Sequence, residues 1–128
     1  MENTNTIRGY LLNPYTGTAE ETEIPNTLDS LSKTLNVQWI DIIHRRIGGK
    51  VFCIVCDDEG LLRDDPKPSA VDSSGAPILA GPLFITNEGY EDLADLTDLD
   101  VKLLDSFVVK AVSINFPSPF PVMFGVDF

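Results

Sequence analysis

The sequence has few residues that could form covalent or metal cross-links, and few that carry positive charge. Its 128 residues include two cysteines and one histidine, which excludes a disulfide-rich scaffold and a complete four-ligand zinc site within one chain. Nine Lys and Arg residues stand against 20 Asp and Glu residues, giving a net charge of −11. This balance argues against direct nucleic-acid binding and against docking on an anionic membrane, because both need a cationic surface.

Long hydrophobic runs are also missing. No stretch of about 18 apolar residues occurs, so no transmembrane helix is expected. The first 30 residues are polar and acidic, without the apolar core of a signal peptide. We therefore expect a cytoplasmic protein. The 43% hydrophobic content is typical of a globular domain, and a chain of this length buries roughly two thirds of its unfolded surface.

Strand composition recurs along the chain. Five segments are rich in β-branched and aromatic residues: Thr6–Leu12, Val37–Ile47, Val51–Cys56, Ile78–Thr86 and Val108–Ile114. An acidic segment, Thr18–Ile24, is expected to pair with the first of them. Gly48-Gly49 is a two-residue hairpin signal, and Gly81-Pro82 predicts a bulge or an edge position because proline cannot donate to a sheet. Residues 61–77 are expected to form a long connection.

Two segments have helical spacing. Leucines recur at i, i+3 and i+7 over Thr27–Leu35, and either Asn26 or Thr27 can cap this helix. Thr97 and Asp100 approximate the capping box of a second helix that ends near Phe107. The predicted core contains Ile7, Leu28, Leu31, Trp39, Ile43, Phe52, Ile54, Phe84, Leu99, Leu103 and Phe107.

These elements predict one α+β domain over residues 1–114. We expect a mixed, largely antiparallel sheet of five or six strands with two helices packed on it. Residues 115–128 form a Phe/Pro-rich C-terminal tail with four Phe and three alternate Pro. Because aromatic side chains are costly to leave in water, the tail either wraps the chain's own core or docks on a second copy or a partner, with Phe116, Phe120 and Phe124 as contacts.

Acidic residues gather around the second predicted helix. Seven acids and one lysine lie between residues 88 and 105. The candidate contact residues are Asp92, Asp95, Asp98 and Asp100. One interpretation is an outer stripe that imitates the phosphate ladder of DNA and occupies a DNA-binding protein. The other is a solvated face that keeps the protein soluble.

Basic residues concentrate at the predicted hairpin tip. His44, Arg45, Arg46 and Lys50 surround the Gly48-Gly49 turn, and they either hold an anionic, nucleotide-like ligand or pair with nearby acids. Cys53 and Cys56 are three residues apart in a predicted strand and point to opposite faces, so their sulfurs are not expected to bond to each other. Both are expected in the core, with a redox or metal role as the alternative.

No arrangement typical of catalysis is readable. The sequence shows no nucleophile–base pair, metal cluster or phosphate loop, and the turn Asp57-Asp58-Glu59-Gly60 lacks the spacing of a calcium loop. We therefore predict a protein that is not an enzyme, with no cofactor and no metal site.

Four segments in this order carry a family resemblance: Asn26–Leu31, Cys53–Gly60, Ile78–Ile85 and Leu96–Asp100. Together they resemble the domain of unknown function 3846, a family found in phages, plasmids and integrative elements of bacteria. The resemblance implies a bacterial host and a role in host takeover or counter-defence, and it supplies no catalytic residues.

Two functions follow as expectations. The first is a non-enzymatic interaction protein that binds a host protein, with DNA-mimic-like inhibition as one form and a homodimer through the tail as a possible assembly. The alternative is a small-ligand module that grips an anionic, nucleotide-like group with the basic hairpin.

Overall fold

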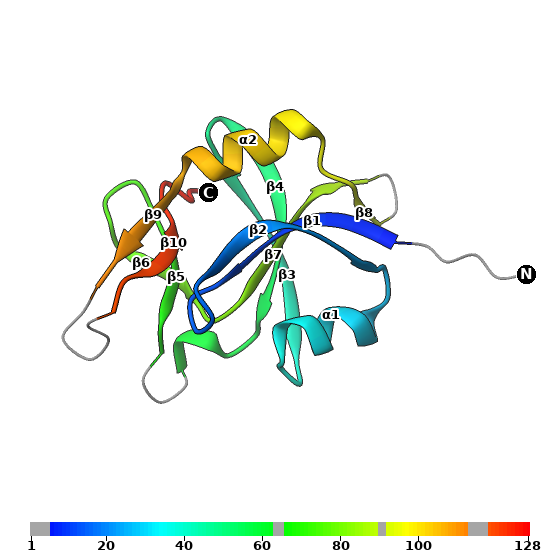
Figure 1. Cartoon of the computed structure of the whole chain (residues 1–128), viewed down its shortest axis with the longest axis horizontal. Helices are drawn as coiled ribbons and strands as arrows, with labels where there is room; N and C mark the ends of the chain where they lie inside the picture. Colours follow the sequence, from blue (N-terminus) through cyan, green and yellow to red (C-terminus); the bar gives the residue numbers. More distant parts are fainter. Residues whose placement is uncertain (1–5, 63–65, 90–91, 113–117) are drawn as a thin grey trace, which may run out of the picture.

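The computed structural model describes residues 6–62, 66–89, 92–112 and 118–128. These residues form ten strands, two α-helices and one 3-10 turn (Figure 1). In chain order they are β1 (Thr6–Asn13), β2 (Thr18–Pro25), α1 (Leu28–Leu35), β3 (Ile40–Ile47), β4 (Lys50–Asp57), η1 (Gly60–Leu62), β5 (Pro68–Val71), β6 (Pro77–Ala80), β7 (Leu83–Glu88), β8 (Leu93–Ala94), α2 (Asp98–Ser106), β9 (Val108–Ala111) and β10 (Phe120–Met123).

The strands make two sheets. The larger one has six strands in the order β2-β1-β7-β4-β3, with β8 beside β7, and the smaller one has the order β6-β5-β10-β9. Neighbouring strands are antiparallel except for β5 and β10, which are parallel. The predicted α+β class and the six-stranded, largely antiparallel sheet are confirmed.

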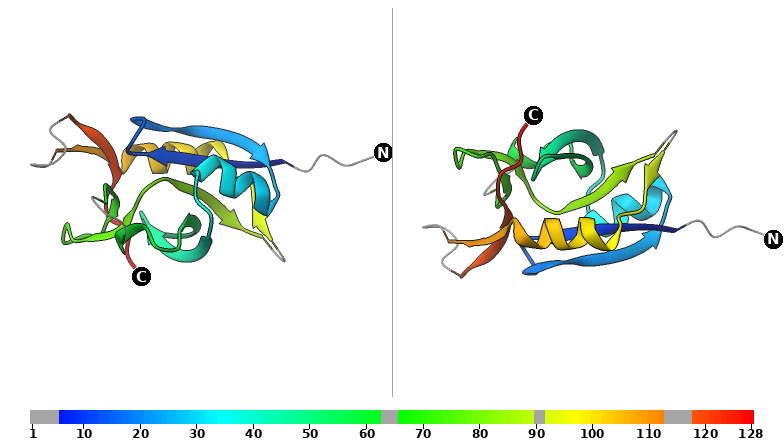
Figure 2. Two further views of the ribbon diagram at one scale, coloured as in Figure 1. Left: turned by 90° about the horizontal axis from the view of Figure 1, so that it is seen from below. Right: turned by 90° about the horizontal axis from the view of Figure 1, so that it is seen from above.

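The larger sheet is curved, and each of its faces covers a separate part of the core. In Figure 2 the β1–β2 ribbon and the β3–β4 hairpin lie on different sides of the molecule, with β7 between them. One face packs against α1 through a cluster that includes Leu31, Leu35 and Phe84. The opposite face packs against α2 and the smaller sheet through a larger cluster that includes Phe52 and Met123.

The β3–β4 hairpin has the turn that its sequence predicts. Gly48 and Gly49 both adopt positive φ, 62° and 85°, as the tightest hairpin loops require. Ile47 therefore pairs with Lys50, and the same register places His44 opposite Cys53. β4 lies between β3 and β7, which accounts for its almost continuous apolar sequence.

The predicted strand Ile78–Thr86 is divided at Gly81-Pro82. Its first part, β6, belongs to the smaller sheet, and its second part, β7, lies inside the larger sheet. Gly81 has a φ of +83°, a conformation that costs glycine little, and Pro82 cannot donate a ladder hydrogen bond. The prediction of a bulge or edge within one strand was therefore wrong: the dipeptide passes the chain from one sheet to the other.

The smaller sheet contains segments that the sequence placed elsewhere. β9 was predicted in the same sheet as β1, and β5 lies within the predicted connection over residues 61–77. β10 comes from the predicted tail and lies between β5 and β9. The pairing of β5 with β10 joins segments far apart in the chain, so no local pattern specifies it.

Both helix starts follow their predicted caps. Of the two candidates for α1, Thr27 is the cap: its side chain accepts a hydrogen bond from the Ser30 backbone N at 3.1 Å. α1 ends at Asn36, whose φ of 57° is left-handed, as expected of a helix-stopping Asn. With 8 and 9 residues, neither α-helix of the described residues is long enough to span a bilayer.

Three predicted core residues are exposed. Leu28 occupies the first position of α1 and is 67% exposed, whereas Leu31 and Leu35 are buried. In α2, Asp100 and Leu104 face inward, so Leu99, about 100° around the helix from Asp100, faces solvent. Trp39 precedes β3, so the strand alternation that predicted its burial does not apply to it.

The rest of the predicted core falls into two groups. Ile7, Leu31, Phe52, Ile54 and Phe84 are buried as predicted. The other three, Ile43, Leu103 and Phe107, are partly buried against the larger cluster.

Candidate functional site

The basic residues of the hairpin do not converge on one point. The Lys50 Nζ donates to Asp100 Oδ1 at 2.6 Å on the α2 side. The Arg45 guanidinium lies 4.2 Å above the centre of the Phe128 ring, and the Arg46 backbone exchanges hydrogen bonds with Asp127. An anion at the Lys50 or Arg45 side chain would therefore compete with partners already within the chain.

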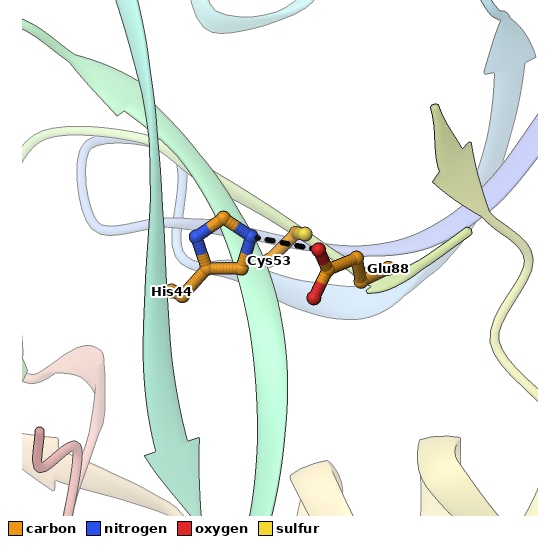
Figure 3. A group of neighbouring side chains, drawn as sticks. All are labelled: His44, Cys53 and Glu88. Atoms are coloured by element: carbon orange, nitrogen blue, oxygen red, sulfur yellow. Dashed lines mark ion pairs between the residues drawn. The ribbon is translucent and has the colours of Figure 1, made fainter. Parts of the chain in front are cut away.

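His44 lies on the other face of the hairpin, in a group of three potential metal ligands (Figure 3). Its Nε2 is 3.5 Å from Glu88 Oε2, and the Cys53 Sγ completes the group, with all ligand atoms within 4.8 Å of one another. They line a hollow of about 320 Å³ that also includes Asp92. The sequence assigned His44 to the basic hairpin tip and not to a group with Cys53. The hairpin register around Gly48-Gly49 was the signal that places it opposite Cys53.

The two thiols are buried and free. Burial raises the pKa of Cys53, with a smaller contribution from Glu88, and burial raises the pKa of Cys56 to about 12. A nucleophilic cysteine needs a lowered pKa, so neither thiol is activated as a nucleophile. Cys56 lies in the larger core cluster, as the sequence predicted, and the two side chains lie on opposite faces of β4 because they are three residues apart.

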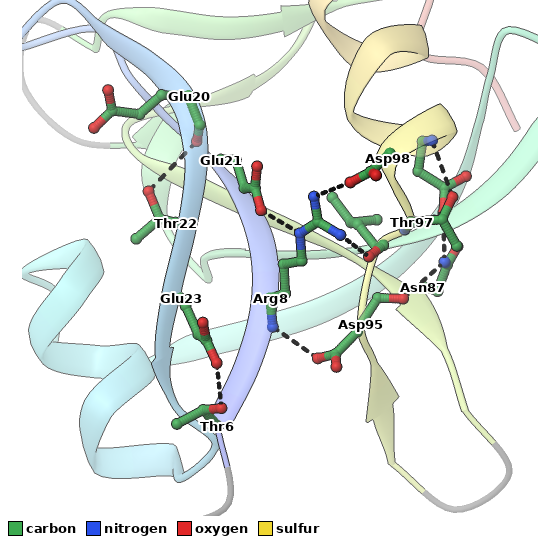
Figure 4. A network of polar contacts seen from close by, with 12 residues as sticks. Thr6, Arg8, Glu20, Glu21, Thr22, Glu23, Asn87, Asp95, Thr97 and Asp98 are labelled. Carbon is green, nitrogen blue, oxygen red and sulfur yellow. Dashed lines mark hydrogen bonds and ion pairs between the residues drawn. The ribbon is translucent and has the colours of Figure 1, made fainter.

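The candidate acids near α2 are tied into the fold rather than arrayed on one face. Arg8 on β1 bonds Asp98 at 2.6 Å, and it also bonds Glu21 and the Leu96 carbonyl (Figure 4). The Arg8 backbone N donates to Asp95 Oδ1 at 2.8 Å. The hydrogen bond from Arg8 lowers the pKa of Asp98, so this acid is stabilised in its charged form by an internal partner.

The other two candidate acids, Asp100 and Asp92, have partners other than Arg8. Asp100 is 5% exposed, and its carboxylate accepts hydrogen bonds from Lys50, Asn87 and the Thr97 backbone N. Asp92 precedes β8, and its Oδ2 accepts a bond from Asn26 at 3.3 Å. An outer stripe along α2 would need all four acids on one exposed face, an arrangement that burial of Asp100 removes.

The predicted contact residues of the tail differ in burial. Phe120 is buried, and Phe124 remains exposed. Phe116 lies outside the described residues. Of the two predicted arrangements of the tail, packing on the chain's own core is the one that Phe120 and Met123 adopt.

A further hollow was not anticipated from the sequence. It is an open cleft of about 630 Å³ between the β1–β2 turn, the segment after α1, the end of β4 and Gly81-Pro82. Trp39 and Tyr15 line it and are 64% and 55% exposed. Asp57 and Glu59 also line it, and none of the described residues that line it is basic.

A second, smaller hollow adjoins the cleft, and Arg45 lines it together with acids. Asp57, Glu59 and Gly60 line both. The second hollow adds the exposed side chains of Leu61 and Leu62. The Lys67 Nζ approaches the Tyr15 ring to 5.5 Å from outside the cleft. The surface thus combines exposed aromatic and aliphatic side chains with carboxylates.

The sequence model of one family, described as a domain of unknown function (DUF3846), matches residues 7–108. The chain belongs to the DUF3846 family. No curated protein and no solved structure matches it significantly. The matched range of the DUF3846 domain includes the whole cleft and the His44–Cys53–Glu88 group, and it ends before β10.

Within the DUF3846 domain, local sequence signals do mark the ends of the segments that build the cleft. Asn36 stops α1 and leaves three residues before β3, which is the segment that carries Trp39. The last residue of β4 is Asp57, and the turn that follows supplies Glu59, whose backbone N donates to Asp57 Oδ1 at 3.0 Å. The single tryptophan of the sequence, placed just after a helix-stopping Asn, was the sequence signal for this cleft. Strand alternation instead assigned Trp39 to the core.

Proposed function

We propose that this protein is a non-enzymatic interaction protein whose cleft, lined by Trp39 and Tyr15, binds a basic, partly apolar segment of a host protein. The observation that carries the proposal is the exposure of both aromatic side chains at one hollow. Trp and Tyr are the residues most enriched among those that dominate binding energy at protein interfaces. Leaving them in water is unfavourable, so a partner that covers them gains free energy.

Charge specifies the kind of partner. Glu59 lines the cleft and Asp58 lines the adjoining hollow, and both acids are exposed. The net charge of −11 attracts basic surfaces over distance and raises the association rate with them. A segment with Lys or Arg beside an aliphatic residue therefore complements the cleft, and the exposed Leu61 and Leu62 extend its apolar part.

The biological setting is part of the proposal. The resemblance to proteins of phages and mobile elements supports a role in the cytoplasm of a bacterial host, in host takeover or counter-defence. DNA-binding proteins present basic surfaces to the phosphates of DNA, so a DNA-mimic-like inhibitor remains one form of this function. Its acids would be the exposed Asp58 and Glu59, since Asp98 and Asp100 are engaged within the chain.

The alternative, an anionic-ligand module at the basic hairpin, has less support. Lys50 is bonded to Asp100 and His44 lies beside Glu88, so a ligand anion would meet carboxylates at both places.

The sole tryptophan makes the proposal testable in solution. Trp39 fluorescence of the full chain is followed during titration with a peptide that alternates Leu and Arg, and with a matched peptide that carries Glu in place of Arg. We expect a blue shift with the Arg peptide, because docking removes the indole from water, and none with the Glu peptide. Tyr15→Ala should weaken binding by about tenfold, the effect of losing about 1.4 kcal/mol.

Leu28→Ala is the matched control, because Leu28 is 67% exposed but lies outside the cleft. It should leave the titration unchanged. In capture from a bacterial lysate, a host protein retained by the Leu28→Ala chain but lost by Trp39→Ala would support the proposal. Equal response to both peptides, or capture that persists in Trp39→Ala, would contradict it.

A further inference from the structure

We propose that His44, Cys53 and Glu88 form a zinc site on the face of the larger sheet that also carries α1. The three residues come from three adjacent strands, β3, β4 and β7. This site is separate from the cleft proposed to bind a partner, because the two hollows share no lining residue.

Strand register brings the ligands together. His44 pairs with Cys53 across β3 and β4, and Cys53 pairs with Thr86 across β4 and β7. Paired residues project from the same face of a sheet, and Glu88, two residues after Thr86, projects from that face as well. The ligands therefore lie on strands held by ladder hydrogen bonds rather than on loops, which fixes their spacing before an ion binds.

The spacing suits a tetrahedral ion. Zinc bonds of about 2.0–2.1 Å to nitrogen and oxygen and about 2.3 Å to sulfur place ligand atoms about 3.3–3.6 Å apart. His44 Nε2 and Glu88 Oε2 are 3.5 Å apart, and all three ligand atoms lie within 4.8 Å of one another. A rotation of the exposed His44 or Glu88 side chain, each at least half exposed, closes the remaining difference without moving the sheet.

The ligand types select the ion. One thiolate, one imidazole and one carboxylate match zinc, which takes sulfur, nitrogen and oxygen ligands, and disfavour magnesium and calcium, which prefer oxygen alone. Two of the ligands are negative when bound, which balances a divalent charge. Asp92 lines the same hollow and adds negative potential that favours a cation there and opposes an anion.

Three protein ligands leave a fourth position open. The hollow of about 320 Å³ is lined on its other sides by Ile42, Gly89 and Leu93, so a water molecule or a small ligand has room at the ion. This is the coordination pattern of zinc sites that keep an exchangeable position, in contrast to closed four-ligand structural sites.

Titration calorimetry of the reduced full chain with Zn²⁺ tests the site. We expect one ion per chain, and binding that is weaker by at least tenfold in His44→Gln and in Glu88→Gln, since even partners that only orient a ligand cost about 10–100-fold in affinity when removed. With Co²⁺ in place of Zn²⁺, a sulfur-to-cobalt charge-transfer absorption should appear in the near ultraviolet and disappear in Cys53→Ser.

Cys56→Ser is the matched control, because Cys56 is the other cysteine of β4 and is buried in the opposite core cluster. It should leave both the affinity and the charge-transfer absorption unchanged. Absorption that persists in Cys53→Ser, or Zn²⁺ affinity that is equal in the wild-type, His44→Gln and Glu88→Gln chains, would overturn the site. If Cys53→Ser fails to fold, the two exposed ligands still decide the result.

Discussion

Among single residues, Asp100 shows most clearly how one side chain joins separate parts of the chain. Burial by itself would raise its pKa, but hydrogen bonds from Lys50, the Thr97 backbone and Asn87 outweigh burial and lower the pKa to about 2. Its carboxylate thereby connects the start of α2 to the β3–β4 hairpin and to β7. A residue counted as surface charge in the sequence acts as an internal connection.

Replacing Asp100 with Asn should destabilise the fold in a pH-dependent way. A lowered native pKa contributes stability above the unfolded value near 3.9, and this contribution is lost as the pH falls toward 2. We expect Asp100→Asn to lower the free energy of unfolding by about 1–3 kcal/mol at pH 7. Urea unfolding at pH 7 and near pH 2 should show the difference from wild type shrinking at the lower pH.

Asp29→Asn is the control for this change. Asp29 is also a carboxylate in the first turn of a helix, but it is exposed and pairs only with the exposed Lys33 at 3.2 Å. Exposed pairs contribute little, so this variant should unfold almost as wild type at both pH values. A difference for Asp100→Asn that is the same at pH 7 and pH 2 would refute the charged network as its cause.

Residue positions at the candidate sites were predictable only where they follow from a local turn. Gly48-Gly49 fixes the register of its hairpin, and with it the contact between His44 and Cys53. Glu88 joins them through the pairing of β4 with β7, strands separated by about a quarter of the chain, and no turn specifies that pairing. The same limit explains why the cleft around Trp39 was missed: four separate segments form it.

At the scale of elements, the starts of both helices depend on threonine caps of different strength. Thr27 accepts one backbone hydrogen bond, from Ser30. Thr97 makes a reciprocal pair: its side chain accepts from the Asp100 backbone N at 3.2 Å, and the Asp100 carboxylate accepts from the Thr97 backbone N at 2.9 Å. Two otherwise unpaired donors are satisfied in α2, against one in α1.

Removing the hydroxyl of Thr97 should therefore weaken the start of α2. We expect Thr97→Ala to cost about 0.5–2 kcal/mol in the free energy of unfolding, measured by urea denaturation. Thr97→Ser keeps the hydroxyl and should stay close to wild type. Should the serine variant lose as much stability as the alanine variant, packing of the threonine methyl group, and not the cap, would be the cause.

Composition and caps predicted which segments form elements, but not which sheet each joins. The strands β1, β3, β4 and β7 overlap their predicted segments. Which sheet a strand joins depends on tertiary packing. Gly81 directs β6 and β7 into different sheets, and β9 pairs with a strand that follows it by eight residues. The prediction of which face of α2 is buried was wrong for a related reason. The inward position of Asp100 is set by Lys50, which lies 50 residues earlier.

At the scale of the whole molecule, the C-terminal residues are part of the core. β10 lies inside the smaller sheet, paired with β9 over four residue pairs and with β5 at Met123. Val126 donates its backbone N to Val71, and Arg46 and Asp127 exchange two backbone bonds. The end of the chain thus holds the smaller sheet against the larger one, although the family match ends at residue 108.

Ending the chain after residue 114 should consequently abolish stable folding. Four side chains that are at least 97% buried, Phe120, Val122, Met123 and Val126, would be removed from the core. Burial of each contributes about 1.5–3 kcal/mol, so the loss is comparable to the whole stability of a typical domain, about 5–15 kcal/mol. We expect the shortened chain to unfold without a cooperative transition and to bind a hydrophobic dye. A chain that lacks only Phe128, which is 91% exposed, should unfold cooperatively like wild type. Cooperative unfolding of the shorter chain would instead mean that residues 6–112 fold without β10, and the tail would again be available to a second copy or a partner.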